Sequence, residues 1–151
     1  MQDDWLEPRL SDWLATLDRH ISECAAPPVL VGHSLACALV AHWAVRAGAG
    51  APVRGALLVA PADVDSPDHT PDEVRSFSPV PLARLPFAST VVASEDDPFV
   101  SPARAAAFAR AWGGRLVTLP HAGHVNADAG FGPWPEGRQL LADLMDESVS
   151  R

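Results

Sequence analysis

The chain is 151 residues long and has a formal charge of −8, since 19 Asp and Glu side chains outnumber 11 arginines. Lysine and tyrosine are absent, which excludes a P-loop lysine, a Schiff-base lysine and the Tyr/Lys pair of some dehydrogenases. The arginines are spread singly along the chain, so no basic stripe can neutralise phosphates, and we expect no nucleic-acid partner.

Apolar residues recur in patterns that alternate between helix and strand. The first pattern is an amphipathic helix that begins near Leu10 and ends near Ile21. The elements that follow are strand 29–31, helix 35–45, strand 56–60, strand 89–93, helix 102–112, strand 116–119 and a closing helix around 140–145. This order predicts an α/β fold, a three-layer sandwich whose mostly parallel sheet is covered on both faces, in one domain over 1–151.

The stretch between Glu23 and Arg46 has no charged residue and is long enough to cross a bilayer. However, Pro27 and Pro28 interrupt any helix there, and the polar segment 32–34 lies in its middle. We therefore interpret it as a buried strand followed by a buried helix and expect no membrane partner.

The acidic start of the chain lacks the basic and then apolar pattern of a secretory signal, which favours a cytoplasmic protein. Cys24 and Cys37 fit that compartment as free thiols.

The segment 63–86 is rich in Pro, Asp and Ser and is interpreted as a rim or lid inserted between two strands. Residues 70–73 have the form of a capping box, with Thr70 as the N-cap of a short helical turn. We expect the rim to form an acyl or leaving-group pocket with the apolar side chains of Phe77, Leu82, Leu85 and Phe87.

A nucleophile elbow is predicted at Gly32-His33-Ser34-Leu35-Ala36, between a buried strand and a helix. In such an elbow the serine occupies a strained turn, and small residues on either side let the strand and helix approach closely. Ser34 is thus the candidate nucleophile. The N–H of Leu35, at the helix N-terminus, is the candidate oxyanion donor.

A serine nucleophile needs a histidine base, and the base needs a carboxylate that holds its tautomer. Asp97 follows the third strand and His124 follows the fourth, in the order Ser, Asp, His. Because the carboxyl ends of parallel strands meet at one edge of the sheet, these loops can bring Ser34, Asp97 and His124 together.

Other residues compete for the acid. Asp96 adjoins Asp97, but Pro98 stiffens the turn directly after Asp97, which favours Asp97. Asp63, after the second strand, stays an alternative acid.

His121 competes with His124 for the role of base, and the flexible Gly123 favours His124 as the projecting residue. His121 is then a structural or rim residue. A metal site at His121, His124 and Asp128 is disfavoured by irregular spacing, so we expect no metal and no cofactor. His33 is interpreted either as a packing residue of the elbow or as one that supports a reacting side chain without contacting the substrate.

Segments along nearly the whole chain resemble the small serine hydrolases of the α/β-hydrolase superfamily typified by retinoblastoma-binding protein nine. The matching segments are the elbow, residues 2–5 with Pro8 and Trp13, and residues 55–61, 77–81, 94–100, 111–113, 123–126 and 130–135. The resemblance implies Ser34 as nucleophile, Asp97 as acid and His124 as base. It implies hydrolysis of a small-molecule ester or amide.

The chain departs from this family at two places. Ala36 stands where the family usually has glycine, a change that the elbow tolerates. Relatives also begin with a buried strand and a Pro-Gly loop upstream of residues 2–13, and that loop supplies a second oxyanion donor. The fold is therefore expected to be truncated at the N-terminus, with an exposed strand edge at 29–31, either as a monomer or as a homodimer paired through it.

The rival function is a non-catalytic protein-binding module with a vestigial triad, because a fold alone does not establish an activity.

Overall fold

A computed structural model describes residues 6–149, with side chains up to residue 146. The segment 2–5, which contributed to the family resemblance, lies outside the described residues. The strands are β1 (Val29–His33), β2 (Gly55–Val59), β3 (Ala88–Ser94) and β4 (Arg115–Leu119). The helices are α1 (Leu10–Ser22), α2 (Leu35–Ala47), α3 (Pro102–Trp112) and α4 (Pro135–Val149), with short 3₁₀ segments η1 (Gly48–Gly50), η2 (Asp72–Phe77) and η3 (Ala127–Ala129).

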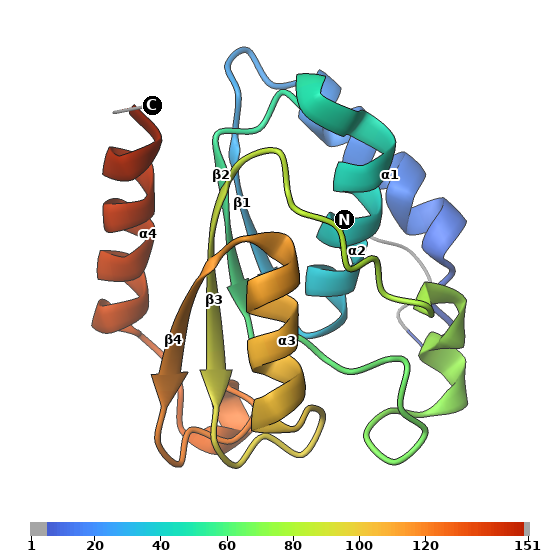
Figure 1. The fold of residues 1–151 in the computed structure, drawn as a ribbon, viewed down its shortest axis with the longest axis vertical. Helices are drawn as coiled ribbons and strands as arrows, with labels where there is room; N and C mark the ends of the chain where they lie inside the picture. The colour runs from blue at the N-terminus through green and yellow to red at the C-terminus, as the bar shows by residue number, and fades with distance from the viewer. Residues whose placement is uncertain (1–5, 150–151) are drawn as a thin grey trace.

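Within the described residues the strands form one parallel sheet in the order β1-β2-β3-β4. The register aligns Val29 with Gly55, Gly55 with Ala88, and Thr90 with Arg115. All carboxyl ends therefore lie at one edge of the sheet, the lower edge in Figure 1. The predicted parallel sheet is confirmed.

Helices cover both faces of this sheet (Figure 1). On one face α1, α2 and α3 enclose a core that includes Trp43, Phe77 and Trp112, all nearly fully buried. On the other face α4 packs Leu144 against Leu57 and neighbouring strand residues. The predicted three-layer α/β arrangement is confirmed, and α4 begins at Pro135, earlier than the sequence pattern suggested.

The ends of α3 follow local signals in the sequence. The Ser101 hydroxyl accepts a hydrogen bond from the N–H of Arg104 at 3.2 Å, and proline occupies the next position. At the other end Gly113 takes φ 71°, a left-handed conformation that favours glycine, and terminates the helix. These caps fix where the loop after β3 ends.

The prediction that Thr70 caps a helical turn is wrong. The N-cap position of η2 is Pro71, which has no side-chain cap. The Thr70 hydroxyl instead donates to the carbonyls of Asp63 and Ser66 and accepts from Arg75. Competition from these partners removes Thr70 from the capping role.

The first part of the rim, residues 64–70, folds around the side chain of Arg75. Its guanidinium donates to the backbone carbonyls of Val64, Ser66 and Thr70. Charge-assisted bonds to carbonyls are stronger than neutral ones, so this part of the rim is held in a defined shape.

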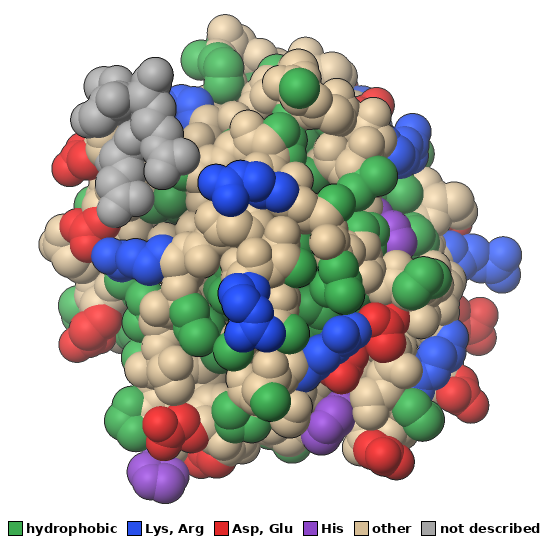
Figure 2. All heavy atoms as spheres, viewed as in Figure 1, with side chains coloured by type: hydrophobic (Ala, Val, Ile, Leu, Met, Phe, Trp, Pro, Cys, Tyr) green, Lys and Arg blue, Asp and Glu red, His purple; other side chains and the backbone are tan. Residues whose placement is uncertain are grey.

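The surface in Figure 2 carries arginines as separate side chains, several of them beside acidic groups. Of the described helices, none is both long and apolar enough to span a membrane.

Candidate active site

Ser34 occupies the sharp turn between β1 and α2. Its backbone has φ 57° and ψ −119°, a region that non-glycine residues avoid at a cost of about 1–3 kcal/mol. The neighbouring Gly32 allows the close approach of strand and helix, because a Cβ atom there would lie 3.2 Å from the carbonyl oxygen of Ala36. This geometry is the strained elbow that the sequence pattern predicted.

The side chains of Ser34, His124 and Asp97 form one continuous chain of hydrogen bonds. The distance from Ser34 Oγ to His124 Nε2 is 2.8 Å, and His124 Nδ1 lies 3.0 Å from each carboxylate oxygen of Asp97. An ionised carboxylate only accepts, so Nδ1 carries the proton and Nε2 is free to accept from the serine hydroxyl. The structure thus brings together the three residues that the sequence singled out.

The carboxylate of Asp97 is oriented by its own loop. Its side chain is fully buried, and Oδ1 also accepts the N–H of Phe99 at 2.9 Å. The Phe99 ring packs on the His124 ring with 4.5 Å between centroids. The turn around Pro98 therefore orients the Asp97 carboxylate and places the Phe99 ring against the imidazole.

Asp96, the neighbour of Asp97, binds a different set of groups. Its Oδ1 accepts the hydroxyl of Ser94 at 2.7 Å and the N–H of Gly123 at 2.8 Å. These two donors hold the pKa of the Asp96 carboxyl below its usual range. The largely exposed ring of His121 lies 3.7 Å from its other oxygen, which makes both residues part of the loop structure.

Asp63, the alternative acid, is held by an arginine. Its Oδ1 is 3.1 Å from Arg104 Nε, and the same guanidinium also binds Asp65. Because Asp97 fills the Nδ1 side of His124, the structure does not bring Asp63 into the hydrogen-bond chain.

Leu35 is the first residue of α2, and its N–H belongs to the turn that has no acceptor within the helix. Such a group, together with the positive end of the helix dipole, suits a developing negative charge beside Ser34. Its role as oxyanion donor stays a prediction.

Cys37 lies directly behind the elbow, fully buried, with Sγ near the carbonyls of Gly32 and Val59. Burial raises the pKa of its thiol far above the usual range, so the sulfur stays protonated and is a poor nucleophile.

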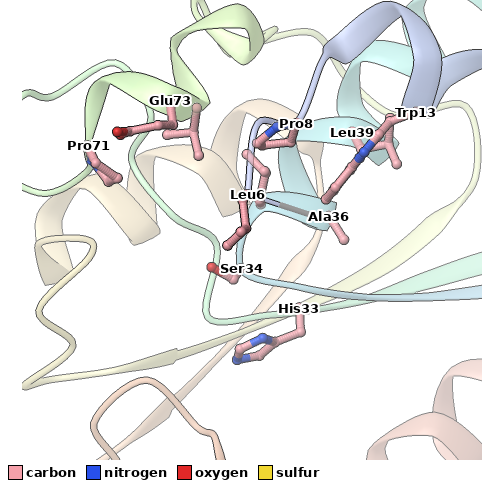
Figure 3. Close-up of a pocket in the computed structure, with 11 residues that line it drawn as sticks. Leu6, Pro8, Trp13, His33, Ser34, Ala36, Leu39, Pro71 and Glu73 are labelled. Carbon is pink, nitrogen blue, oxygen red and sulfur yellow. The ribbon is translucent and has the colours of Figure 1, made fainter. Parts of the chain in front are cut away.

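A pocket of about 540 Å³ opens beside Ser34. Figure 3 shows Leu6, Pro8 and Trp13 on the side toward α1, with Pro71 and Glu73 of the rim on the opposite side. Its lining residues are Leu6, Pro8, Trp13, His33, Ser34, Leu35, Ala36, Leu39, Pro71, Glu73 and Val74. The pocket is therefore mostly apolar and has the size of a small-molecule site.

The rim contributes Pro71, Glu73 and Val74 to this pocket, but none of the four apolar side chains expected there, Phe77, Leu82, Leu85 and Phe87, lines it. Phe77 and Leu85 are buried in the core, and Leu82 is exposed away from it. Leu6 and Pro8, just before α1, also line the pocket, and no periodic pattern of the sequence predicted this. Trp13 was predicted as part of the apolar stripe of a helix and of a segment that resembles the family, and neither pattern predicted its place in the pocket.

Within residues 6–149 no group of three or more His, Cys, Asp or Glu side chains is arranged to hold a metal ion.

Comparison with known proteins supports the same class. The profile of the serine hydrolase family matches residues 1–143. The chain therefore belongs to the serine hydrolase family of the α/β-hydrolase superfamily, as the resemblance to the group of retinoblastoma-binding protein nine implied. A comparison with curated protein sequences gave no match.

Solved structures share the fold. A YdeN-like protein from Pectobacterium atrosepticum is 32% identical, with a TM-score of 0.84 over 98% of this chain and 75% of that chain. The ydeN gene product from B. subtilis is 23% identical, with a TM-score of 0.76 over 96% of this chain and 80% of that chain. Est1E from Butyrivibrio proteoclasticus is 14% identical, with a TM-score of 0.68 over 96% of this chain and 73% of that chain.

Proposed function

We propose that this protein hydrolyses small esters or amides with uncharged, apolar acyl groups through an acyl-enzyme on Ser34. One observation carries the proposal: a serine in a strained elbow lies 2.8 Å from the Nε2 of a histidine whose Nδ1 is bound by a buried carboxylate. This is the arrangement that activates a serine hydroxyl for acyl transfer.

In the first half of the reaction, Ser34 Oγ attacks the carbonyl carbon while its proton passes to His124 Nε2. The carbonyl oxygen gains negative charge beside the N–H of Leu35. When the tetrahedral intermediate collapses, the bond to the leaving group breaks and Nε2–H protonates the departing alcohol or amine. An ester of Ser34 with the acyl group remains.

In the second half, His124 takes a proton from water, and the oxygen of that water attacks the acyl-enzyme. Collapse breaks the bond to Ser34 Oγ, which recovers its proton from Nε2 as the acid leaves. Asp97 stays ionised throughout, holds the tautomer of His124 and stabilises the imidazolium.

The pocket supports the substrate class. Its lining is mostly apolar, and Glu73 is an acidic residue that faces it. A carboxylate there, on a chain of charge −8, disfavours phosphorylated or otherwise anionic substrates. Acyl groups of a few carbons with no charge fit these walls best.

A fluorophosphonate probe tests the nucleophile. We expect the probe to label Ser34 of the wild-type chain, and Ser34→Ala to abolish labelling and lower ester hydrolysis by about 10⁴- to 10⁶-fold. Labelling that survives the substitution would rule out Ser34. A wild type that is folded but neither labelled nor active would favour the non-catalytic binding module instead.

Narrowing the pocket tests its role. Val74→Trp places a large ring in the lining, and we expect the ratio of kcat/KM for p-nitrophenyl hexanoate to that for the acetate to fall by about 10-fold or more. Val45→Trp, on an exposed position of α2 outside the lining, is the matched control and should leave the ratio unaltered. An unchanged ratio in Val74→Trp would show that the acyl group does not bind in this pocket.

The cytoplasmic location stays a prediction, and the free thiols of Cys24 and Cys37 fit it. A small-molecule ester or amide remains the expected partner.

A further inference from the structure

The loop that carries His124 has to cross the sheet. It leaves β4 at one edge of the described sheet, whereas Ser34 follows β1 at the opposite edge. The imidazole must therefore be held in place far from β4, the strand that precedes its loop.

On the β4 side, this loop is anchored to the last residue of β3 and to the turn that follows it. The N–H of Ala122 binds the Ser94 hydroxyl at 2.9 Å, and the N–H of Gly123 binds Asp96 Oδ1 at 2.8 Å. These bonds fix the loop on the β4 side, one and two residues before His124.

On the β1 side, the same loop has a different anchor. His33, the last residue of β1, has Nε2 at 2.7 Å from the backbone carbonyl oxygen of His124. A carbonyl can only accept, so Nε2 carries the proton and donates it. In Figure 3 the His33 ring points away from Leu6 and Pro8, and it packs on the His124 ring with 4.7 Å between centroids.

The backbone of this loop is strained, so it needs such an anchor. His121, Gly123 and Val125 have φ values of 49°, 51° and 49°, a left-handed region that two of these three residues disfavour. A strained loop persists only where surrounding contacts hold it, and it relaxes when one contact is removed.

We propose that His33 is a positioning residue for the base: its Nε2–H holds the main chain of His124 at the β1 side, so that the imidazole stays aligned with Ser34 Oγ. This inference rests on the proposed function of the site. A misplacement of about 1 Å between reacting groups can lower a rate by about 100-fold, so one anchoring hydrogen bond is enough to affect turnover.

Two substitutions separate the donor from the ring. His33→Phe keeps an aromatic ring against His124 but removes the donor. His33→Gln has an amide nitrogen as many bonds from Cα as imidazole Nε2, and it restores the donor without the ring. We expect His33→Phe to lower kcat by roughly 10- to 100-fold with a much smaller change in KM, and His33→Gln to recover most of kcat.

A second readout does not depend on activity. Amide hydrogen exchange over residues 121–126 should be faster in His33→Phe than in the wild type and should return toward the wild-type rate in His33→Gln. His20→Phe is the matched control, since His20 Nδ1 also pairs with a backbone carbonyl, that of Thr16 at 2.7 Å, on the exposed side of α1. It should alter neither kcat nor the exchange of the loop.

The outcomes are distinguishable. A wild type without esterase activity defeats the proposed function, while loop exchange still decides the role of His33. Wild-type kcat and loop exchange in His33→Phe, or equal losses in His33→Phe and His33→Gln, would overturn the inference. If His33→Phe does not fold, His33→Asn, whose shorter amide does not reach the carbonyl, should show the same losses relative to His33→Gln.

Discussion

Asp97 and Asp96 are neighbours in the chain, yet their carboxylates serve different partners. Asp97 is buried against His124 Nδ1, whereas Asp96 binds Ser94 and Gly123 near the surface. A carboxylate that only supports a loop accepts the same hydrogen bonds as an amide oxygen. One that holds a histidine tautomer cannot be replaced by an amide, because the amide can turn a donor toward Nδ1.

Substitution of each acid by its amide should therefore give unequal losses. We expect Asp97→Asn to lower kcat by about 10⁴-fold, because it favours the wrong tautomer of His124. Asp96→Asn and Asp63→Asn should cost far less, since neither contacts the imidazole. Steady-state kinetics on a p-nitrophenyl ester measure all three. If Asp63→Asn proved the most damaging, the acid would lie on the earlier loop.

Sequence reasoning could predict the meeting of Ser34, Asp97 and His124 because each residue follows a buried strand of one parallel sheet. It could not predict the bond from His33 to the carbonyl of His124, which joins residues 91 positions apart. That contact depends on the path of a loop across the sheet edge, and no periodicity records such a path. The same holds for Leu6, which lines the pocket from a segment before the first helix.

Among the structural elements, the loop 120–126 is hydrogen-bonded to the turn after β3 through the carboxylate of Asp96. Its pKa lies below the ordinary value near 3.8, chiefly because the Ser94 hydroxyl and the Gly123 N–H stabilise the carboxylate. A group whose pKa is lower in the folded form stabilises that form at pH above its unfolded pKa. This contribution disappears as the pH falls through the lower folded value.

The free energy of unfolding should therefore decrease below about pH 4, in part because Asp96 becomes protonated. We expect the urea midpoint of the wild type to fall more between pH 5 and pH 3 than that of Asp96→Asn, which has no carboxyl to titrate. Other acids titrate equally in both proteins, so the difference between the two slopes reports Asp96. An equal fall of the urea midpoint in both proteins would show that the hydrogen bond between Asp96 and the loop does not depend on the charge of Asp96.

Most elements could be predicted because their signals are local. Ser101 caps α3, and Gly113 ends it with a positive φ. Thr70 carried the same kind of signal, yet its hydroxyl donates to the carbonyls of Asp63 and Ser66 and accepts from Arg75 of the same 3₁₀ segment. Local capping rules fail where other groups bind the same hydroxyl.

At the scale of the whole molecule, β1 is an edge strand within the described residues, paired only with β2. Val31, in its middle, is 61% exposed. An apolar strand edge promotes pairing between chains, and a lysine on the edge opposes it. We therefore expect the 151-residue chain to self-associate and Val31→Lys to shift it toward the monomer in size-exclusion chromatography.

Val45→Lys is the matched control, because Val45 is 55% exposed on α2, where no strand edge is present. The two substitutions change the net charge equally. A similar shift in both would assign the effect to charge, and no shift in either would show that the β1 edge does not drive association.

In the proposed reaction the acyl group passes through Ser34 as a covalent ester. The most direct measurement is the mass of the protein after rapid acid quench of its reaction with p-nitrophenyl butyrate, followed by peptide mapping. We expect one butyryl group per chain, on the peptide that contains Ser34, and none in Ser34→Ala. Butyryl on another residue, or turnover by Ser34→Ala at the wild-type rate, would contradict it.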